Sequence, residues 1–125
     1  MLKTIRLEEA VLRAKKLADD KLAKGENADE FVLIGEADDF RLYITAGKTV
    51  KETYPEGLHE NPRDVFMLIL EGQLELAFKN GAKQIFKTRE CFVLPKHTKH
   101  KCVFKKMTVA LEGVYEEGLW HEIKK

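Results

Sequence analysis

The sequence predicts a mainly β protein, a sandwich or jelly-roll barrel of antiparallel strands preceded by one α-helix. Three observations support this fold class. Residues 4–24 have apolar side chains at helical spacing, and from residue 30 onward short β-type segments alternate with turn residues. The pair Asn80-Gly81 lies between two such segments, where it predicts a type I′ hairpin.

The predicted helix at residues 4–24 is amphipathic. Its apolar face consists of Leu7, Val11, Ala14, Ala18 and Leu22. Thr4 is the expected N-cap, and Gly25 is the expected residue just after the helix. We therefore divide the chain into an N-terminal helix with its linker, residues 1–28, and a β-barrel, residues 29–125. An apolar helix face needs a surface to cover, and we expect a homodimer.

The expected strands are short and closely spaced. A loop containing Pro55, Gly57, Asn61 and Pro62 separates the third strand from the fourth. The strands are predicted at Phe31–Ile34, Phe40–Ala46, Lys48–Tyr54, Val65–Leu70, Leu74–Phe78, around Ile85 and Phe86, and at Cys91–Leu94, His100–Phe104, Met107–Val114 and Leu119–Ile123.

Length and composition indicate a soluble single-domain protein. The chain has 125 residues, of which 44% are hydrophobic and 34% charged. The longest apolar run, Val65–Leu70, is too short to span a bilayer, and Glu8 and Glu9 argue against a secretory signal. Cys91 and Cys102 are too few for a disulfide framework, so we expect free thiols and a cytoplasmic protein.

Two segments contain the candidate functional residues. Residues 57–72 form a loop with a histidine, followed by an apolar strand that ends at Gly72. In residues 90–102 a strand reaches Pro95, and His100 follows in the next segment. These segments resemble the two motifs of the cupin family, over roughly residues 30–115. The resemblance implies a jelly-roll β-barrel with a ligand or metal pocket.

The resemblance places only two of the family's usual metal ligands in this chain. A typical cupin site uses three His and one Glu. His59 falls on the first His of the first motif, Asn61 on the second His and Val65 on the Glu. In the second motif His100 matches the His, while His97 replaces a Gly and is expected to be a left-handed turn residue.

Three side chains are candidates to complete a metal site with His59 and His100. Asn61 offers an amide oxygen, and Cys102 lies two residues beyond His100, on the same face of a regular strand. Asp64 would need a β-bulge to point inward. We expect at most one divalent transition metal, with zinc, iron, manganese, nickel and copper all open. Without a metal, these histidines would be polar pocket residues, Asn61 a loop residue, Cys102 a buried apolar residue and Asp64 a surface carboxylate.

Residues 79–106 are strongly basic, since Glu90 is their only acidic residue. The ordinary interpretation is a solvated strand face, because Lys alternates with apolar residues. Lys96 and Lys99 flank the second motif, where they predict a positive field that favours an anionic ligand. The segment lacks the exposed aromatic residues of a nucleic-acid platform, so we expect no nucleic-acid partner.

Two functions are compatible with these residues. The first is a small-molecule-binding cupin of unassigned activity, in which Asn61, Lys96 and Lys99 contact the ligand. The alternative is a metal-dependent enzyme of the isomerase or dioxygenase type, acting on a small anionic substrate such as a sugar phosphate or a carboxylate. The absent Glu argues against the usual iron or manganese chemistry. Trp120 and His121 are expected to be packing or rim residues.

Overall fold

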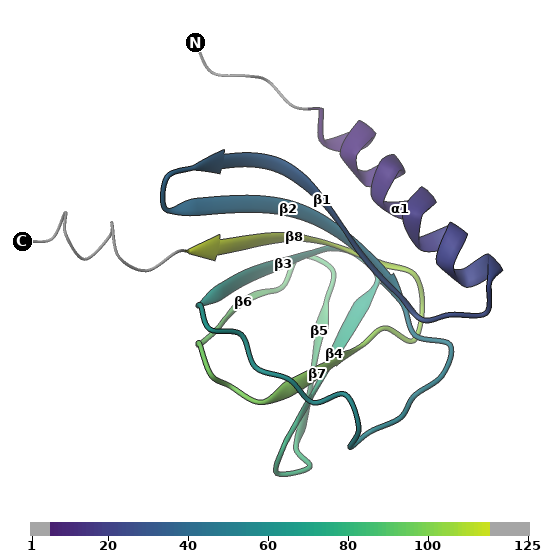
Figure 1. Cartoon of the computed structure of the whole chain (residues 1–125), viewed down its shortest axis with the longest axis vertical. Helices are drawn as coiled ribbons and strands as arrows, with labels where there is room; N and C mark the ends of the chain where they lie inside the picture. The colour runs from purple at the N-terminus through teal and green to yellow at the C-terminus, as the bar shows by residue number, and fades with distance from the viewer. Residues whose placement is uncertain (1–5, 116–125) are drawn as a thin grey trace, which may run out of the picture.

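The computed structural model of the chain describes residues 6–115. The predicted strand Leu119–Ile123, with Trp120 and His121, lies outside this range. The described chain consists of one helix followed by strands (Figure 1). These are α1 (Leu7–Ala23), β1 (Ala28–Ala37), β2 (Phe40–Lys48), β3 (Val65–Glu71), β4 (Gln73–Phe78), β5 (Lys83–Lys87), β6 (Cys91–Leu94), β7 (His100–Val103) and β8 (Thr108–Tyr115).

The strands form two antiparallel sheets. The larger has the order β1-β2-β8-β3-β6, and the smaller has the order β5-β4-β7. Strands β3 and β4 follow each other in the chain but lie in different sheets, so the chain changes sheet at Gly72. The mainly antiparallel β class with one N-terminal helix is therefore confirmed.

The larger sheet has a hydrophobic core on each face. Helix α1 covers its outer face, where Ala10, Ala14 and Ala18 pack on residues of β1, β2 and β8. The inner face contributes to a second core that includes residues of both sheets. Strand β8 contributes Val109 to the outer core and Ala110 to the inner core, as the alternation of a strand requires.

Helix α1 is shorter than predicted, and its buried face is rotated. Thr4 lies outside the described residues, and Arg6 is the N-cap, without a side-chain capping bond. At the other end, the prediction for Gly25 is confirmed, because it has φ 76° and donates its N–H to the carbonyl of Leu22 at 2.9 Å. Leu7 is 46% exposed, so the predicted apolar face was wrong there.

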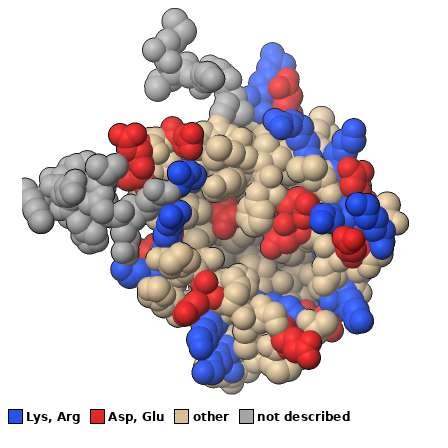
Figure 2. All heavy atoms as spheres, viewed as in Figure 1, with Lys and Arg blue, Asp and Glu red and all other residues tan. Residues whose placement is uncertain are grey.

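The surface that the helix covers belongs to its own chain. This removes the helix face as an argument for a second subunit, and the homodimer stays a prediction. No helix among residues 6–115 is long and apolar enough to cross a membrane. The face of the molecule shown in Figure 2 carries both acidic and basic side chains.

The predicted strand at Lys48–Tyr54 is wrong, because β2 ends at Lys48 and a loop follows. Backbone groups of this loop form hydrogen bonds with side chains, where a strand would pair with a neighbouring strand. The Asn27 side-chain oxygen accepts the N–H groups of Val50 and Lys51, each at 2.8 Å. The Asn27 amide nitrogen in turn donates to the Lys51 carbonyl at 2.8 Å.

The hairpin between β4 and β5 is confirmed, but its turn is not of type I′. Gly81 has φ 86°, whereas Asn80 is not among the residues with positive φ. The Phe78 N–H donates to the Ala82 carbonyl at 2.9 Å, and the Gly81 N–H donates to the Phe78 carbonyl at 3.0 Å. These bonds define a longer loop, Lys79–Gly81, in which only the glycine needs the left-handed conformation.

Candidate functional site

The two sequence motifs are joined by backbone hydrogen bonds. His59 and His100 form an isolated antiparallel β-bridge, with N–H···O distances of 2.9 Å in both directions. The two segments are joined again at Asn61, whose carbonyl accepts the N–H of His97 at 2.8 Å. His97 has φ 65°, which confirms the left-handed turn expected at this position. The bridge therefore brings together residues that lie far apart in the sequence.

The imidazole rings of His59 and His100 lie next to each other. Their centroids are 4.4 Å apart, with 56° between the ring planes. His100 Nδ1 lies 2.7 Å from the Thr98 carbonyl, and His59 Nδ1 lies 3.3 Å from the Gly57 carbonyl. Because a carbonyl only accepts hydrogen bonds, Nδ1 is the donor in both contacts, and the neutral form of each ring has its lone pair on Nε2.

The surroundings of His100 favour its neutral form. It is only 2% exposed, and this burial lowers the pKa of its imidazole. The hydrogen bond to Thr98 acts in the opposite direction, and the neighbouring His59 lowers the pKa further. His59 is more exposed and lies at the edge of the site.

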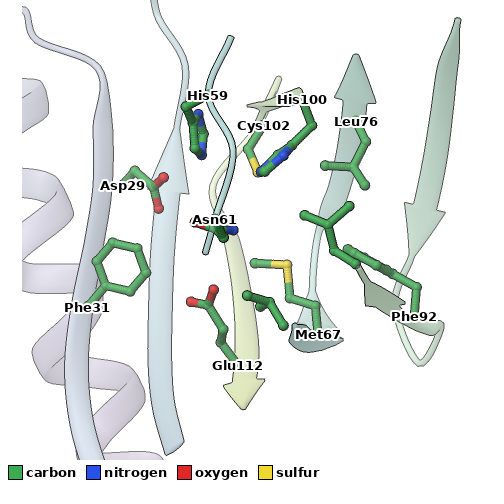
Figure 3. A pocket seen from close by; sticks show the side chains of 12 residues that line it. Asp29, Phe31, His59, Asn61, Met67, Leu76, Phe92, His100, Cys102 and Glu112 are labelled. Atoms are coloured by element: carbon green, nitrogen blue, oxygen red, sulfur yellow. The ribbon is translucent and has the colours of Figure 1, made fainter. Parts of the chain in front are cut away.

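The two rings line a cavity of about 80 Å³. In Figure 3 the carboxyl groups of Asp29 and Glu112 lie on one side of the cavity, and the apolar side chains of Met67, Leu76 and Phe92 lie on the other. Among residues 6–115, the lining consists of Asp29, Phe31, His59, Asn61, Val65, Met67, Leu76, Phe92, Leu94, His100, Cys102 and Glu112.

Asp29 and Glu112 were missed by the sequence analysis. Asp29 lies near the start of β1, where the sequence gives no signal that its side chain faces a cavity. Glu112 did carry a signal. It shares the strand alternation of Ala110 and Val114 within the apolar strand β8, so a charged side chain there faces the inside of the protein.

Both carboxyl groups are more easily protonated than usual. Burial raises the pKa of Glu112 to about 7, and the nearby Asp29 carboxyl raises it further. Partial exclusion of water likewise raises the pKa of Asp29 to about 6, with a smaller contribution from Glu30 and an opposing one from His59. Glu112 Oε2 is buried and has no hydrogen-bond partner among residues 6–115.

The other predicted pocket residues divide into two groups. Asn61, Val65 and Cys102 line the cavity, and burial raises the pKa of the Cys102 thiol well above its usual value. Asp64 does not line the cavity. It is exposed, and its Oδ1 accepts the backbone N–H of Lys96 at 2.8 Å, so it is a surface carboxylate that holds the second motif in place.

The residues present do not form a complete metal site. Within the described part of the chain, no group of three or more His, Cys, Asp or Glu side chains is placed to hold a metal ion. Two imidazoles alone are fewer ligands than either structural or catalytic zinc normally takes. Metal binding through His59, His100, Asn61 and Cys102 therefore stays a prediction.

Lys96 and Lys99 lie outside the inner cavity. Lys99 lines a groove of about 370 Å³, together with Leu58, His59, Glu60 and Lys79. A wider groove of about 440 Å³ shares four lining residues with the cavity on another side. The shared residues are Phe31, Asn61, Val65 and Glu112. The inner cavity thus adjoins open grooves on two sides.

Comparison of the whole chain with known proteins identifies its fold. No protein-family profile matches the sequence, and no curated protein matches it. Solved structures do match. A cupin-2 domain protein from Shewanella frigidimarina has a TM-score of 0.61 and 20% identity, over 78% of this chain and 91% of that one. This chain has the cupin fold.

Two further structures support the assignment to the cupin fold. An RmlC-like cupin protein from Desulfovibrio desulfuricans matches with a TM-score of 0.65 and 19% identity, over 92% of this chain and 97% of that one. A candidate mannose-6-phosphate isomerase from Ralstonia eutropha matches with a TM-score of 0.61 and 14% identity, over 70% of this chain and 84% of that one. At such identities the likeness concerns the fold, and function has to be argued from the site.

Proposed function

We propose that this cupin binds a small molecule in the cavity beside His59 and His100. The observation that carries this proposal is the pair of adjacent imidazoles, each held by a backbone carbonyl at Nδ1. Their Nε2 atoms are free to accept hydrogen bonds from a ligand. Polar groups with a fixed orientation inside a largely apolar cavity are typical of a small-molecule site.

The apolar and polar parts of the cavity have different tasks in this proposal. Met67, Leu76 and Phe92 exclude water and contact the carbon atoms of the ligand (Figure 3). The imidazoles fix the ligand's orientation, and Asn61, which lies where the cavity meets the wider groove, offers an amide that both donates and accepts.

An enzyme of the isomerase type is a second candidate. It is favoured by the Asp29 and Glu112 carboxyls, whose pKa values of about 6 and about 7 suit proton transfer near neutral pH. The likeness of the fold to the candidate mannose-6-phosphate isomerase is compatible with this activity. Because the described residues do not complete a metal site, we derive no metal-dependent step.

The experiment that tests ligand binding follows the His100 ring by NMR while compounds are added. We expect binding compounds to shift the His100 ring signals, because its side chain lines the cavity. In calorimetric titration, which does not need the His100 ring signal, His100→Ala should weaken the binding of the same compounds at least tenfold, whereas the control His97→Ala, at an exposed turn, should not. Compounds that bind both variants as tightly as the wild type would place the ligand elsewhere.

Turnover separates the two candidate functions. Solvent-deuterium incorporation into a bound sugar phosphate or hydroxy acid, detected by mass spectrometry, would indicate an isomerase-type proton transfer. Glu112→Gln should then abolish the incorporation without abolishing binding. Binding without any deuterium exchange would leave the small-molecule-binding module as the function.

A further inference from the structure

The polar groups that line the cavity are mostly hydrogen-bond acceptors. In the neutral form, His59 and His100 each present an Nε2 lone pair, because their Nδ1 protons are donated to backbone carbonyls. Asp29 and Glu112 present carboxyl oxygens, and Glu112 Oε2 has no partner in the described part of the chain. A buried acceptor without a donor is costly, so the cavity favours a ligand that supplies hydrogen-bond donors.

The charge of the lining favours a positively charged donor. Asp29 and Glu112 line the cavity together, and none of its described lining residues is a Lys or Arg. The structure places neither carboxyl in an ion pair with a described residue, and the main charge acting on Glu112 is the other carboxyl. The basic residues nearby line the grooves outside the cavity: Lys79 and Lys99 lie in the groove beyond His59, and Arg63 lies in the wider groove.

An aromatic pair stands where the cavity meets the wider groove. Phe31 lines both spaces, and its ring contacts Tyr43 edge to face, with 6.0 Å between centroids and 79° between planes. Phe31 is 50% exposed, so one part of its ring is open to an arriving molecule. Aromatic faces attract organic cations, so the Phe31 ring is a third feature, beside the acceptor groups and the carboxyl charges, that favours a cation.

We propose that the cavity binds a small organic cation, a primary ammonium group or a comparable donor, between the Asp29 and Glu112 carboxyls and the two imidazole Nε2 atoms. This inference rests on the proposed ligand-binding function and names the ligand class. The ammonium group donates hydrogen bonds in several directions, and its charge offsets that of the carboxyl pair. The small volume of about 80 Å³ suits a short headgroup, with any longer substituent in the wider groove.

The test compares three probes of equal length, n-propylammonium, 1-propanol and propionate, at constant ionic strength. Binding is measured from the NMR shifts of the His100 ring. We expect n-propylammonium to bind at least tenfold more tightly than propionate or 1-propanol. Glu112→Gln and Asp29→Asn should each weaken ammonium binding by about tenfold. Glu71→Gln, a change in an exposed carboxylate paired with Lys15 away from the cavity, should leave it unchanged.

The outcomes distinguish the ligand class from the proposed function. If propionate or 1-propanol shifts the His100 ring and binds as tightly as n-propylammonium, the cavity binds ligands but the cation assignment is wrong. If no probe shifts the ring of the folded protein, both the ligand class and the cavity's binding role are wrong. Unchanged ammonium binding by both Glu112→Gln and Asp29→Asn, with their fold verified by thermal unfolding, would also overturn the cation assignment.

Discussion

Glu112 couples the stability of the protein to pH. Its pKa is raised from 4.5 to about 7 in the folded protein, so the folded state binds more protons than the unfolded state between these values. The free energy of unfolding should therefore fall as pH rises through this window. The cost at pH 8 is on the order of 2 kcal/mol, since Glu112 keeps partial contact with solvent.

Glu112→Gln should remove most of this pH dependence. The amide has nearly the same shape but no charge, so we expect the variant to be more stable than the wild type at pH 8 by about 1–2 kcal/mol. Urea unfolding between pH 5 and pH 8, in buffers of about equal ionic strength, measures the difference. The control Glu71→Gln should keep the wild-type slope, and an equally steep slope in Glu112→Gln would contradict the assignment.

Metal binding by His59 and His100 can be tested at the same scale. Two imidazoles without a complete ligand set predict weak binding of a divalent metal, with water in the remaining positions. Protons compete for the Nε2 atoms, so binding should weaken as pH falls through the imidazole range. In calorimetric titration of untagged protein with Zn²⁺, His100→Ala should abolish binding and His97→Ala should not. Metal retained by His100→Ala would rule out these ligands.

At the scale of elements, the turn from β3 to β4 depends on Gly72. It has φ 89°, and a Cβ atom there would lie 2.6 Å from Thr108 Oγ1 and 2.7 Å from the Met107 carbonyl. Gly72→Ala should therefore lower the free energy of unfolding by about 2–4 kcal/mol, from backbone strain and overpacking together. Urea unfolding measures this loss.

Gly81 is the matched control, because it has φ 86° but open space where a Cβ would lie. Gly81→Ala should cost only about 1–2 kcal/mol, the backbone term alone. Equal losses for Gly72→Ala and Gly81→Ala would show that the contact with Thr108 is relieved without cost.

The elements were more predictable from the sequence than the site. The pattern of apolar and polar residues located most strands, because a strand that packs on a core needs apolar residues at a defined spacing. The same pattern wrongly predicted a strand at Lys48–Tyr54. The backbone of this segment is bound by the side chain of Asn27, which is remote in sequence and cannot be recognised from the local pattern. The motifs located His59 and His100, but not Asp29, whose cavity position depends on how β1 pairs with β2.

At the scale of the whole molecule, the edge of the larger sheet is where we predict a second copy to bind. Strand β1 forms this edge, and Leu33 leaves about half of its surface exposed. A long edge strand with exposed apolar residues tends to associate. Sedimentation velocity at tens of micromolar, roughly, should show a dimer. Leu33→Lys should shift it toward monomer and Leu12→Lys, on the exposed helix surface, should not; a wild-type monomer would contradict the prediction.

The bridge between His59 and His100 also bears on how such a site can change during evolution. Its two hydrogen bonds join backbone atoms, so they do not depend on which side chains the two positions carry. Substitution at either position can thus exchange the chemistry offered to the cavity while the supporting frame stays in place. The same backbone bridge can therefore present a different pair of side chains to the cavity.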